Sequence, residues 1–229
     1  MENLFAQALN DMLTTQCDPK AVRHIEAQPH DRELWNILAD SGFADALLAE
    51  NAGGADLPLE QAFDLWELCG RHSLPLPLPE TMWARAQLHA AGVVAPAGPI
   101  GIGLGAVPAT DAALVVDVSA GRCCDHVLAC GPEGWLLLPI HSATVQPHGL
   151  GMDARISWPA AAWQAGVRLP AGPIDLKTAQ ALLAAAQMSG SMMVVFEQSL
   201  EHANQRQQFG KPIGKFQAIQ HNLSLMAEQ

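Results

Sequence analysis

The sequence contains no tyrosine and is poor in charged and aromatic side chains. Of its 229 residues, only 15% are charged and 5% aromatic, whereas 49% are hydrophobic. Lysine and arginine together number 12 against 23 aspartates and glutamates, which gives a formal charge of −11. A nucleic-acid partner requires a basic face that meets phosphates, so this balance argues against one. A chain of this length and apolar content has enough side chains to build a packed core.

Cysteines are few and do not form a recognisable framework. The number is odd and no C-x-x-C pair occurs, which argues against both a disulfide scaffold and a zinc knuckle. The five are Cys17, Cys69, Cys123, Cys124 and Cys130. The last three could be imagined as metal ligands together with His126, but their spacing fits no common site. Buried thiols are therefore the favoured interpretation, and we expect no metal.

The sequence predicts neither a leader peptide nor a membrane span. The start, MENLFAQALNDMLTTQ, lacks a basic segment and is typical of an amphipathic helix rather than a signal peptide. The most apolar run, residues 179–196, is interrupted by Gln180, Gln187 and the triplet from Ser189 to Ser191. A span needs ~20 predominantly apolar residues, so this run predicts a buried helix. We expect a cytoplasmic protein with no membrane span.

Residues 1–92 have the pattern of a helical domain. Asp31 is a candidate N-cap for a helix through ELWNILADSGF, which Gly42 would end. A loop, AENAGGADLPLE, precedes a second helix, LEQAFDLWELCGR. The apolar face of that second helix would comprise Leu59, Phe63, Trp66 and Cys69 or Gly70. SLPLPLPE is predicted to be extended, with Pro79 opening a further helix, ETMWARAQLHAAG.

Residues 93–173 and 174–229 complete an α+β plan. The first of these segments has short β-type runs, ALVVDV, DHVLAC, GWLLLPI and ARISW, separated by the turn signals GPEG and HGLG. They predict a small, mostly antiparallel β-domain. Asp175 can then cap a long helix that runs to about Arg206, where Gly190 lets another helix approach closely. This helix would start a C-terminal antiparallel helical bundle.

The stretch RQQFGKPIGKFQAIQHNL, residues 206–223, concentrates basic residues and glycines in an otherwise acidic, apolar chain. It is not a phosphate loop, because only three residues separate Gly210 from Gly214-Lys215 and Phe216 stands where Ser or Thr is required. We expect Gly210 to end the long helix and Pro212 to enforce the stop. A following helix would then pack through Phe216, Ile219, Leu223 and Met226.

That packing leaves Arg206, Gln208 and Gln217 unexplained at one corner between two helices. The planar fork of an arginine suits a diphosphate or a carboxylate because it can bind two oxygens at once. From the residues alone, a purely structural corner remains the better supported interpretation.

Three stretches together resemble the acyl-CoA dehydrogenase family. R-x-Q-F-G-K-P-I, from Arg206 to Ile213, followed by Phe216-Gln217 and Gln220, matches the family's R-x-x-F-G-x-P-I-x-x-F-Q pattern. LWNILADSGF and AENAGGADLPLEQAFDLWELCGR resemble its N-terminal helices in order and spacing. The plan of helices, β-domain and helices agrees as well.

The resemblance implies an FAD-dependent α,β-dehydrogenation of an acyl-CoA thioester, in fatty acid or sterol side-chain metabolism. The corner would reach the FAD of a neighbouring subunit in a homo- or hetero-oligomer, with Arg206 on the pyrophosphate. Gln208 and Phe209 would line the adenosine side, and further contacts would come from Ile213, Phe216 and Gln217. An electron-transfer flavoprotein is a possible electron acceptor.

Two departures from the family pattern leave other roles open. No T-E-x-x-x-G-S-D loop occurs between Gly92 and Asp117, and no carboxylate of this chain, which stops at Gln229, matches the family's base. We therefore name no catalytic residue and expect an incomplete C-terminal domain, either a fragment or a naturally short chain. Glu197 and Glu201 are expected to be surface or helix-pair charges. The alternatives are a non-catalytic partner subunit of a hetero-oligomeric acyl-CoA dehydrogenase and a helical interaction protein that keeps only the fold.

Overall fold

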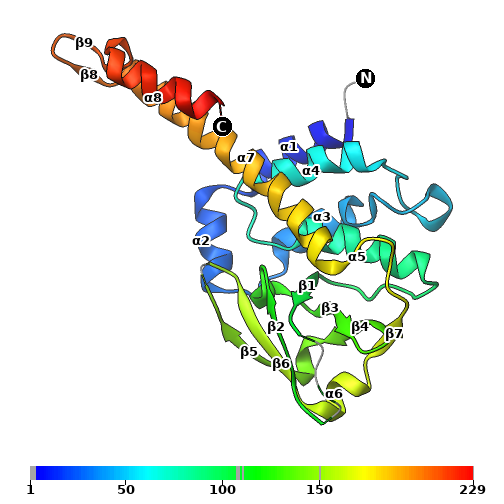
Figure 1. Ribbon diagram of the computed structural model, residues 1–229. Coiled ribbons are helices and arrows are strands. Elements are labelled where there is room, and N and C mark those ends of the chain that lie inside the picture. Colours follow the sequence, from blue (N-terminus) through cyan, green and yellow to red (C-terminus); the bar gives the residue numbers. More distant parts are fainter. Residues whose placement is uncertain (1–3, 107–108, 110, 150, 229) are drawn as a thin grey trace.

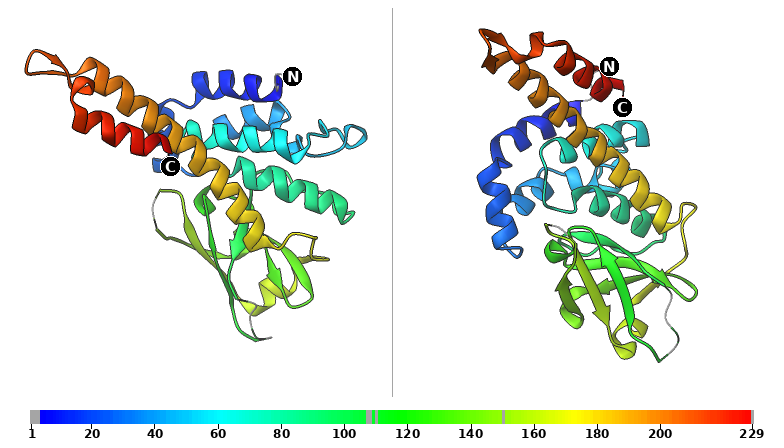
Figure 2. Two further views of the ribbon diagram at one scale, coloured as in Figure 1. Left: turned by 45° about the horizontal axis from the view of Figure 1, so that its top comes forward. Right: turned by 60° about the vertical axis from the view of Figure 1, so that its left-hand side comes forward.

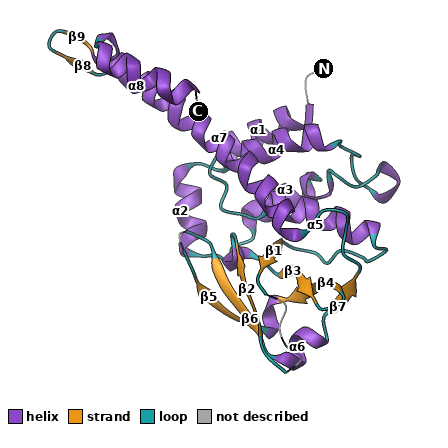
Figure 3. Ribbon diagram, in the orientation of Figure 1, coloured by secondary structure: helices purple, strands orange, loops and turns teal. Residues whose placement is uncertain are grey.

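Helices enclose a central β-sheet on one side, and a pair of C-terminal helices extends away from it (Figure 1, Figure 3). The computed structural model describes residues 4–106, 109, 111–149 and 151–228. Its helices are α1 (Leu4–Gln16), α2 (Pro19–Ala27), α3 (Glu33–Asp40), α4 (Leu59–Arg71), α5 (Leu78–Ala90), α6 (Ala160–Gln164), α7 (Leu176–Gln205) and α8 (Gln217–Glu228). The expected α+β plan is confirmed.

The sheet has seven strands in the order β5-β6-β2-β1-β3-β4-β7. They are β1 (Ile100–Leu104), β2 (Leu114–Val118), β3 (His126–Gly131), β4 (Gly134–Pro139), β5 (Thr144–Pro147), β6 (Ala154–Trp158) and β7 (Val167–Leu169). The pairing of β1 with β3 is parallel and the others are antiparallel, as the sequence predicted. The four β-type runs became β2, β3, β4 and β6, whereas β1, β5 and β7 were not predicted.

Local signals set the ends of the N-terminal helices. The carboxylate of Asp31 accepts the backbone N–H of Glu33 at 2.9 Å, although the residue that directly precedes α3 is Arg32. The cap was therefore predicted one residue too early along the chain. Gly42 ends this segment in the left-handed conformation, with φ of 80°. On α4, Leu59 is half exposed, so its predicted place on the buried face was wrong; Leu65 is buried instead, because the helix turns its first residue outward.

The sheet is joined to the helices through buried contacts on α5. The hydroxyl of Thr81 accepts the N–H of Ile100 at 2.8 Å and donates to the carbonyl of Pro77 at 2.6 Å. The rings of Trp83 on α5 and Trp135 on β4 lie 5.6 Å apart. One hydrophobic cluster runs from the N-terminal helices through β1 and β4 to α7. The sheet is thus held by the helical layer on this face.

Helix α7 crosses α4 at a point where both helices present glycine. A Cβ atom on Gly190 would lie 1.9 Å from the carbonyl oxygen of Glu67, and one on Gly70 would lie 1.8 Å from that of Gln187. The hydroxyl of Ser191 donates to the carbonyl of Gly70 at 2.9 Å. The prediction that Gly190 allows another helix to approach is confirmed. Asp175 caps α7 by accepting the N–H of Thr178 at 2.9 Å, also as predicted.

The second half of α7 leaves the body of the molecule and carries an exposed apolar surface (Figure 2). Met192, Met193, Val195 and Leu200 are all exposed on it. By length and composition α7 could cross a membrane, and 28% of its most apolar window is buried. The prediction of a buried helix holds only for its first half, where Leu176, Leu183 and Ala186 are buried. Apolarity along the chain does not reveal which neighbours cover a helix.

Candidate functional site

The predicted cofactor corner lies beyond the C-terminal end of α7 and contains a small hairpin. Strands β8 (Gln207–Gln208) and β9 (Lys211–Pro212) pair in antiparallel register. The two residues between them, Phe209 and Gly210, both have positive φ, at 50° and 76°. Two left-handed residues are what a tight hairpin turn requires. The prediction that Gly210 ends the helix was wrong: α7 ends at Gln205, and Gly210 forms the hairpin turn.

The hairpin brings several of the predicted cofactor residues close together. The rings of Phe209 and Phe216 meet edge to face, with centroids 6.1 Å apart. The N–H of Ile213 donates to the carbonyl of Arg206 at 2.8 Å, which holds the two ends of the hairpin together. Phe209 is 92% exposed, and Arg206, Gln208 and Gln217 are exposed as well. Their contact with a cofactor stays a prediction.

The corner carries positive side chains on a protein whose formal net charge is −11. Arg206, Lys211 and Lys215 are exposed, and no ion pair in the described part of the chain includes any of them. The ammonium of Lys211 lies 4.4 Å from the centre of the Phe216 ring. A guanidinium and an ammonium that no described carboxylate pairs, beside the exposed ring of Phe209 and the half-buried ring of Phe216, can bind the phosphates and the base of a dinucleotide.

Helix α8 follows the corner and packs only loosely. Ile219 and Leu223 line a groove that α8 shares with α7, but both are half exposed and Met226 is exposed. The predicted apolar stripe therefore faces α7 without being buried, because two helices alone cannot enclose it.

A second candidate site is a cavity of about 390 Å³ between the helices and the sheet. Its walls come from the loop after α4, from α5 and α7, and from two loops at the sheet edge. Leu74, Leu76, Ala120, Met152, Ala184 and Met188 supply apolar surface, and Ser73, Glu80, Ser119, Asp153, Gln180 and Gln187 supply polar groups. Sequence reasoning named none of these polar residues as a site.

Glu80 is the most deeply buried acidic side chain of this cavity, with 3% of its surface exposed. Burial raises the pKa of its carboxyl above the ordinary value of 4.5, and the amide hydrogen bonds only partly oppose this. Gln180 and Gln187 donate to Glu80 Oε1 over 3.3 and 3.4 Å, both long for an N–H···O bond. Burial thus disfavours the charged form of this carboxyl. The α5 sequence gives no signal of this, since Glu80 directly follows Pro79 in an ordinary first turn.

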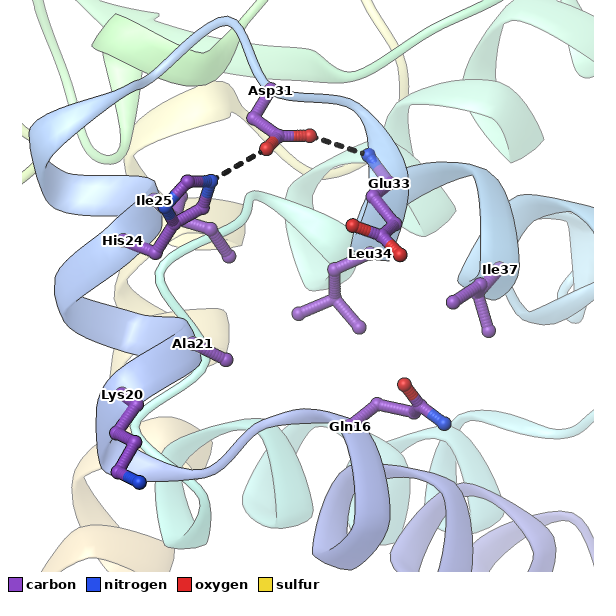
Figure 4. A pocket seen from close by; sticks show the side chains of 9 residues that line it. All are labelled: Gln16, Lys20, Ala21, His24, Ile25, Asp31, Glu33, Leu34 and Ile37. Atoms are coloured by element: carbon purple, nitrogen blue, oxygen red, sulfur yellow. Dashed lines mark hydrogen bonds and ion pairs between the residues drawn. The ribbon is translucent and has the colours of Figure 1, made fainter.

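A third hollow, of about 360 Å³, lies between α1, α2 and α3 (Figure 4). His24 Nε2 and Asp31 Oδ2, both from residues that line it, are hydrogen-bonded at 2.7 Å. The backbone N–H of Glu33 and the His24 ring lower the pKa of Asp31, which is the ordinary effect of a partnered carboxylate.

The cysteines behave as core residues. Cys17, Cys69, Cys123 and Cys124 are buried and unpaired. Burial raises the pKa of the Cys17 and Cys123 thiols to about 11, which keeps them protonated and unreactive. The prediction of buried thiols is confirmed for these four; Cys130 is half-buried.

Known proteins are similar to this chain over its C-terminal segment and over nearly its whole length. The family model "Acyl-CoA dehydrogenase, C-terminal domain" matches residues 178–229. Acyl-CoA dehydrogenase IpdE2 of Mycobacterium tuberculosis is 30% identical, over 96% of this chain and 69% of that protein. Among solved structures, a variant of the Tcur3481-Tcur3483 steroid ACAD is 25% identical, with a TM-score of 0.78 over 97% of this chain and 72% of that one. The ChsE4-ChsE5 complex from M. tuberculosis is 21% identical, with a TM-score of 0.73 over 98% of this chain and 72% of that one.

Proposed function

This chain belongs to the acyl-CoA dehydrogenase family, and on that premise we propose that it is a subunit of an FAD-dependent oligomer that carries out α,β-dehydrogenation of an acyl-CoA thioester. Its own contribution is the corner from Arg206 to Gln217, offered to the FAD of a neighbouring subunit. When bound, FAD supplies the acceptor for the hydride that leaves the β-carbon. The protein residues position the dinucleotide and exclude water from it.

The position of the corner carries this proposal. Arg206 and the β8–β9 hairpin lie at the end of α7 that is remote from the sheet, while the other end of α7 packs beside the sheet (Figure 1). The corner therefore cannot reach a flavin held over its own sheet. An exposed cation and an exposed ring at the tip of a projecting helix suit a ligand held by another chain.

The chemistry of the corner fits the dinucleotide. Arg206 would bind the pyrophosphate oxygens through its planar fork, and Phe209 and Phe216 would stack beside the adenosine. Gln208 and Gln217 would add amide hydrogen bonds, and Ile213 an apolar contact. The exposed methionines of α7 support the oligomer, because such a surface is stabilised when a second chain covers it.

Retention of FAD by the purified assembly tests the proposal. The tagged chain is isolated with the subunits that accompany it, and bound flavin is released with acid and measured by fluorescence. Arg206→Ala should weaken FAD binding roughly 10- to 150-fold, from the loss of charge-assisted hydrogen bonds. Arg23→Ala, which removes an exposed arginine from α2, is the matched control and should retain FAD fully. Equal retention by both variants would contradict the role of Arg206, and an assembly without flavin would contradict the function itself.

A second role, that of a non-catalytic partner subunit, is favoured by a chain that keeps the Arg206 to Gln217 corner but lacks a T-E-x-x-x-G-S-D loop between Gly92 and Asp117. In this role the chain would support a catalytic neighbour through the corner alone. Turnover of an acyl-CoA by this chain in the absence of any other subunit would exclude it.

A further inference from the structure

A cleft of about 580 Å³ lies at the end of α5, and neither the cofactor corner nor the central cavity uses it. One wall is formed by residues 45–53, which follow α3, and the other by residues 92–97, which link α5 to β1. The first wall and the end of α5 project on the side of the molecule opposite the β8–β9 hairpin (Figure 2, left view). The cleft is therefore separate from the site proposed above.

Both walls of this cleft are mainly apolar. The side chain of Val94 is 89% exposed at its rim, which is unusual for a large aliphatic residue on an ordered link. An apolar ligand that covers such a side chain is stabilised by the surface it removes from water. The apolar residues that line the cleft are Leu48, Ala52, Val93, Val94, Ala95, Pro96 and Ala97.

The polar groups of the cleft are a buried arginine and its partner. The side chain of Arg85 is only 11% exposed, and its Nη1 donates to Asp45 Oδ2 at 2.8 Å. Its Nε is buried and has no hydrogen-bond partner among the described residues. A buried donor without an acceptor costs free energy, so a ligand that supplies the acceptor gains affinity. His89, one helical turn further along α5, lines the same cleft and is exposed.

A carboxylate is the group that fits this set of donors. The guanidinium carries its N–H groups in a planar fork and can hold a carboxylate on each edge, and Asp45 occupies one of them. An amine finds no free acceptor on Arg85 or His89⁺, whereas a carboxylate can accept from both. The apolar walls favour an aliphatic stem behind the charged group, and the volume lies within the range of small-molecule sites.

We propose that this cleft binds a small molecule whose carboxylate ends an aliphatic stem, with Arg85 holding the carboxylate on the edge of the guanidinium that Asp45 leaves free. His89 adds a second donor at the rim, and the stem lies against Val93 and Val94. The site shares no lining residue with the central cavity, so the inference does not depend on the proposed function.

A matched pair of small probes tests the inference. Hexanoate and hexanamide have nearly the same size and differ in the charge of the head group. Binding of each to the purified assembly is measured by isothermal titration calorimetry. Hexanoate should bind roughly tenfold or more tightly, because hydrogen bonds from arginine to a charged acceptor are the stronger ones. Equal affinities, or no binding of hexanoate, would overturn the proposal.

Substitutions at the rim assign the binding to this cleft. Val94→Asp places a negative charge beside the bound carboxylate and should weaken hexanoate roughly threefold or more, while binding of hexanamide stays unchanged. Val94→Asn removes the same apolar surface without the charge and is the matched control. Hexanoate affinity that is the same in both Val94 variants would place the binding elsewhere and overturn the assignment.

A substitution of the arginine tests the fork itself. Arg85→Lys keeps a positive charge beside Asp45 but loses the second edge, so hexanoate should lose most of its advantage over hexanamide. Urea unfolding of the same sample shows whether this variant is folded; if it is not, the two Val94 variants still decide the question. A folded Arg85→Lys protein that keeps the full preference for hexanoate would show that Arg85 only pairs with Asp45.

Discussion

Replacing Gly190 with alanine should separate α4 from α7 and destabilise the fold. The new Cβ would lie 1.9 Å from the carbonyl oxygen of Glu67 and 2.8 Å from the backbone nitrogen of Arg71. Both neighbours are backbone atoms in a helix, so no side-chain rotation can relieve the contact. The two helices must move apart by roughly 1 Å or more to restore an ordinary van der Waals distance.

The size of the effect follows from three contributions. Overpacking of this kind typically costs about 1–3 kcal/mol. Separation also stretches the hydrogen bonds from Ser191 to Gly70, at 2.9 Å, and from Ser189 to Glu67, at 2.8 Å, each worth about 0.5–1.5 kcal/mol. Against these, alanine is a better helix former than glycine by about 0.8–1.0 kcal/mol. We expect the free energy of unfolding to fall by about 2–3 kcal/mol.

Urea unfolding followed by tryptophan fluorescence measures this, since Trp66 is fully buried on α4 near the crossing. Gln198→Ala is the matched control: it raises helix propensity on the same helix at an exposed position where nothing clashes. If Gly190→Ala is as stable as Gln198→Ala, the helices do not touch at this point and the packing described here is wrong.

Two further predictions concern α5. Thr81→Val should lower the free energy of unfolding by about 1–3 kcal/mol in the same urea assay, because it leaves the buried N–H of Ile100 without a partner. An unchanged urea midpoint would show that the Thr81 hydroxyl does not join the sheet to α5. Burial raises the pKa of the Glu80 carboxyl in the folded state above its ordinary value of 4.5. Between that value and the raised pKa, the folded state binds more protons than the unfolded state. The free energy of unfolding therefore falls as pH rises through this window, by up to about 1.4 kcal/mol per pH unit. Glu80→Gln should abolish this component in unfolding curves measured across the same pH range; an identical pH dependence in both proteins would mean that Glu80 is ionised in the fold.

Much of the fold could be predicted because its signals are local. Asp175 caps α7 through a hydrogen bond to a residue three positions away, and Gly42 adopts the left-handed conformation directly after α3. The strands that were missed lack such signals. Strand β1, IGIGL, alternates glycine with apolar residues, and it is a strand because β2 and β3 pair with both of its edges.

The cofactor corner was found through a resemblance, whereas its shape came from the structure. The pattern from Arg206 to Gln217 identified which residues to consider, but Gly210 was expected at the end of a helix. The hairpin arises because Phe209 and Gly210 both turn left-handed and let Gln207 pair with Pro212. A glycine two residues before a proline signals a turn without specifying which kind.

The sequence by itself determined the α+β plan, four of the seven strands, the Asp175 cap, the small residue at Gly190 and the basic stretch after α7. Each of these signals lies within a few residues along the chain. Only the tertiary structure decided that Glu80 is buried with a raised pKa, that Gln180 Oε1 is buried without a hydrogen-bond partner among the described residues, and that α7 is covered on one half and exposed on the other. The physical reason is that desolvation depends on what surrounds a group in space. Glu80 and Gln180 stand 100 residues apart, and only the folded chain brings them out of water together.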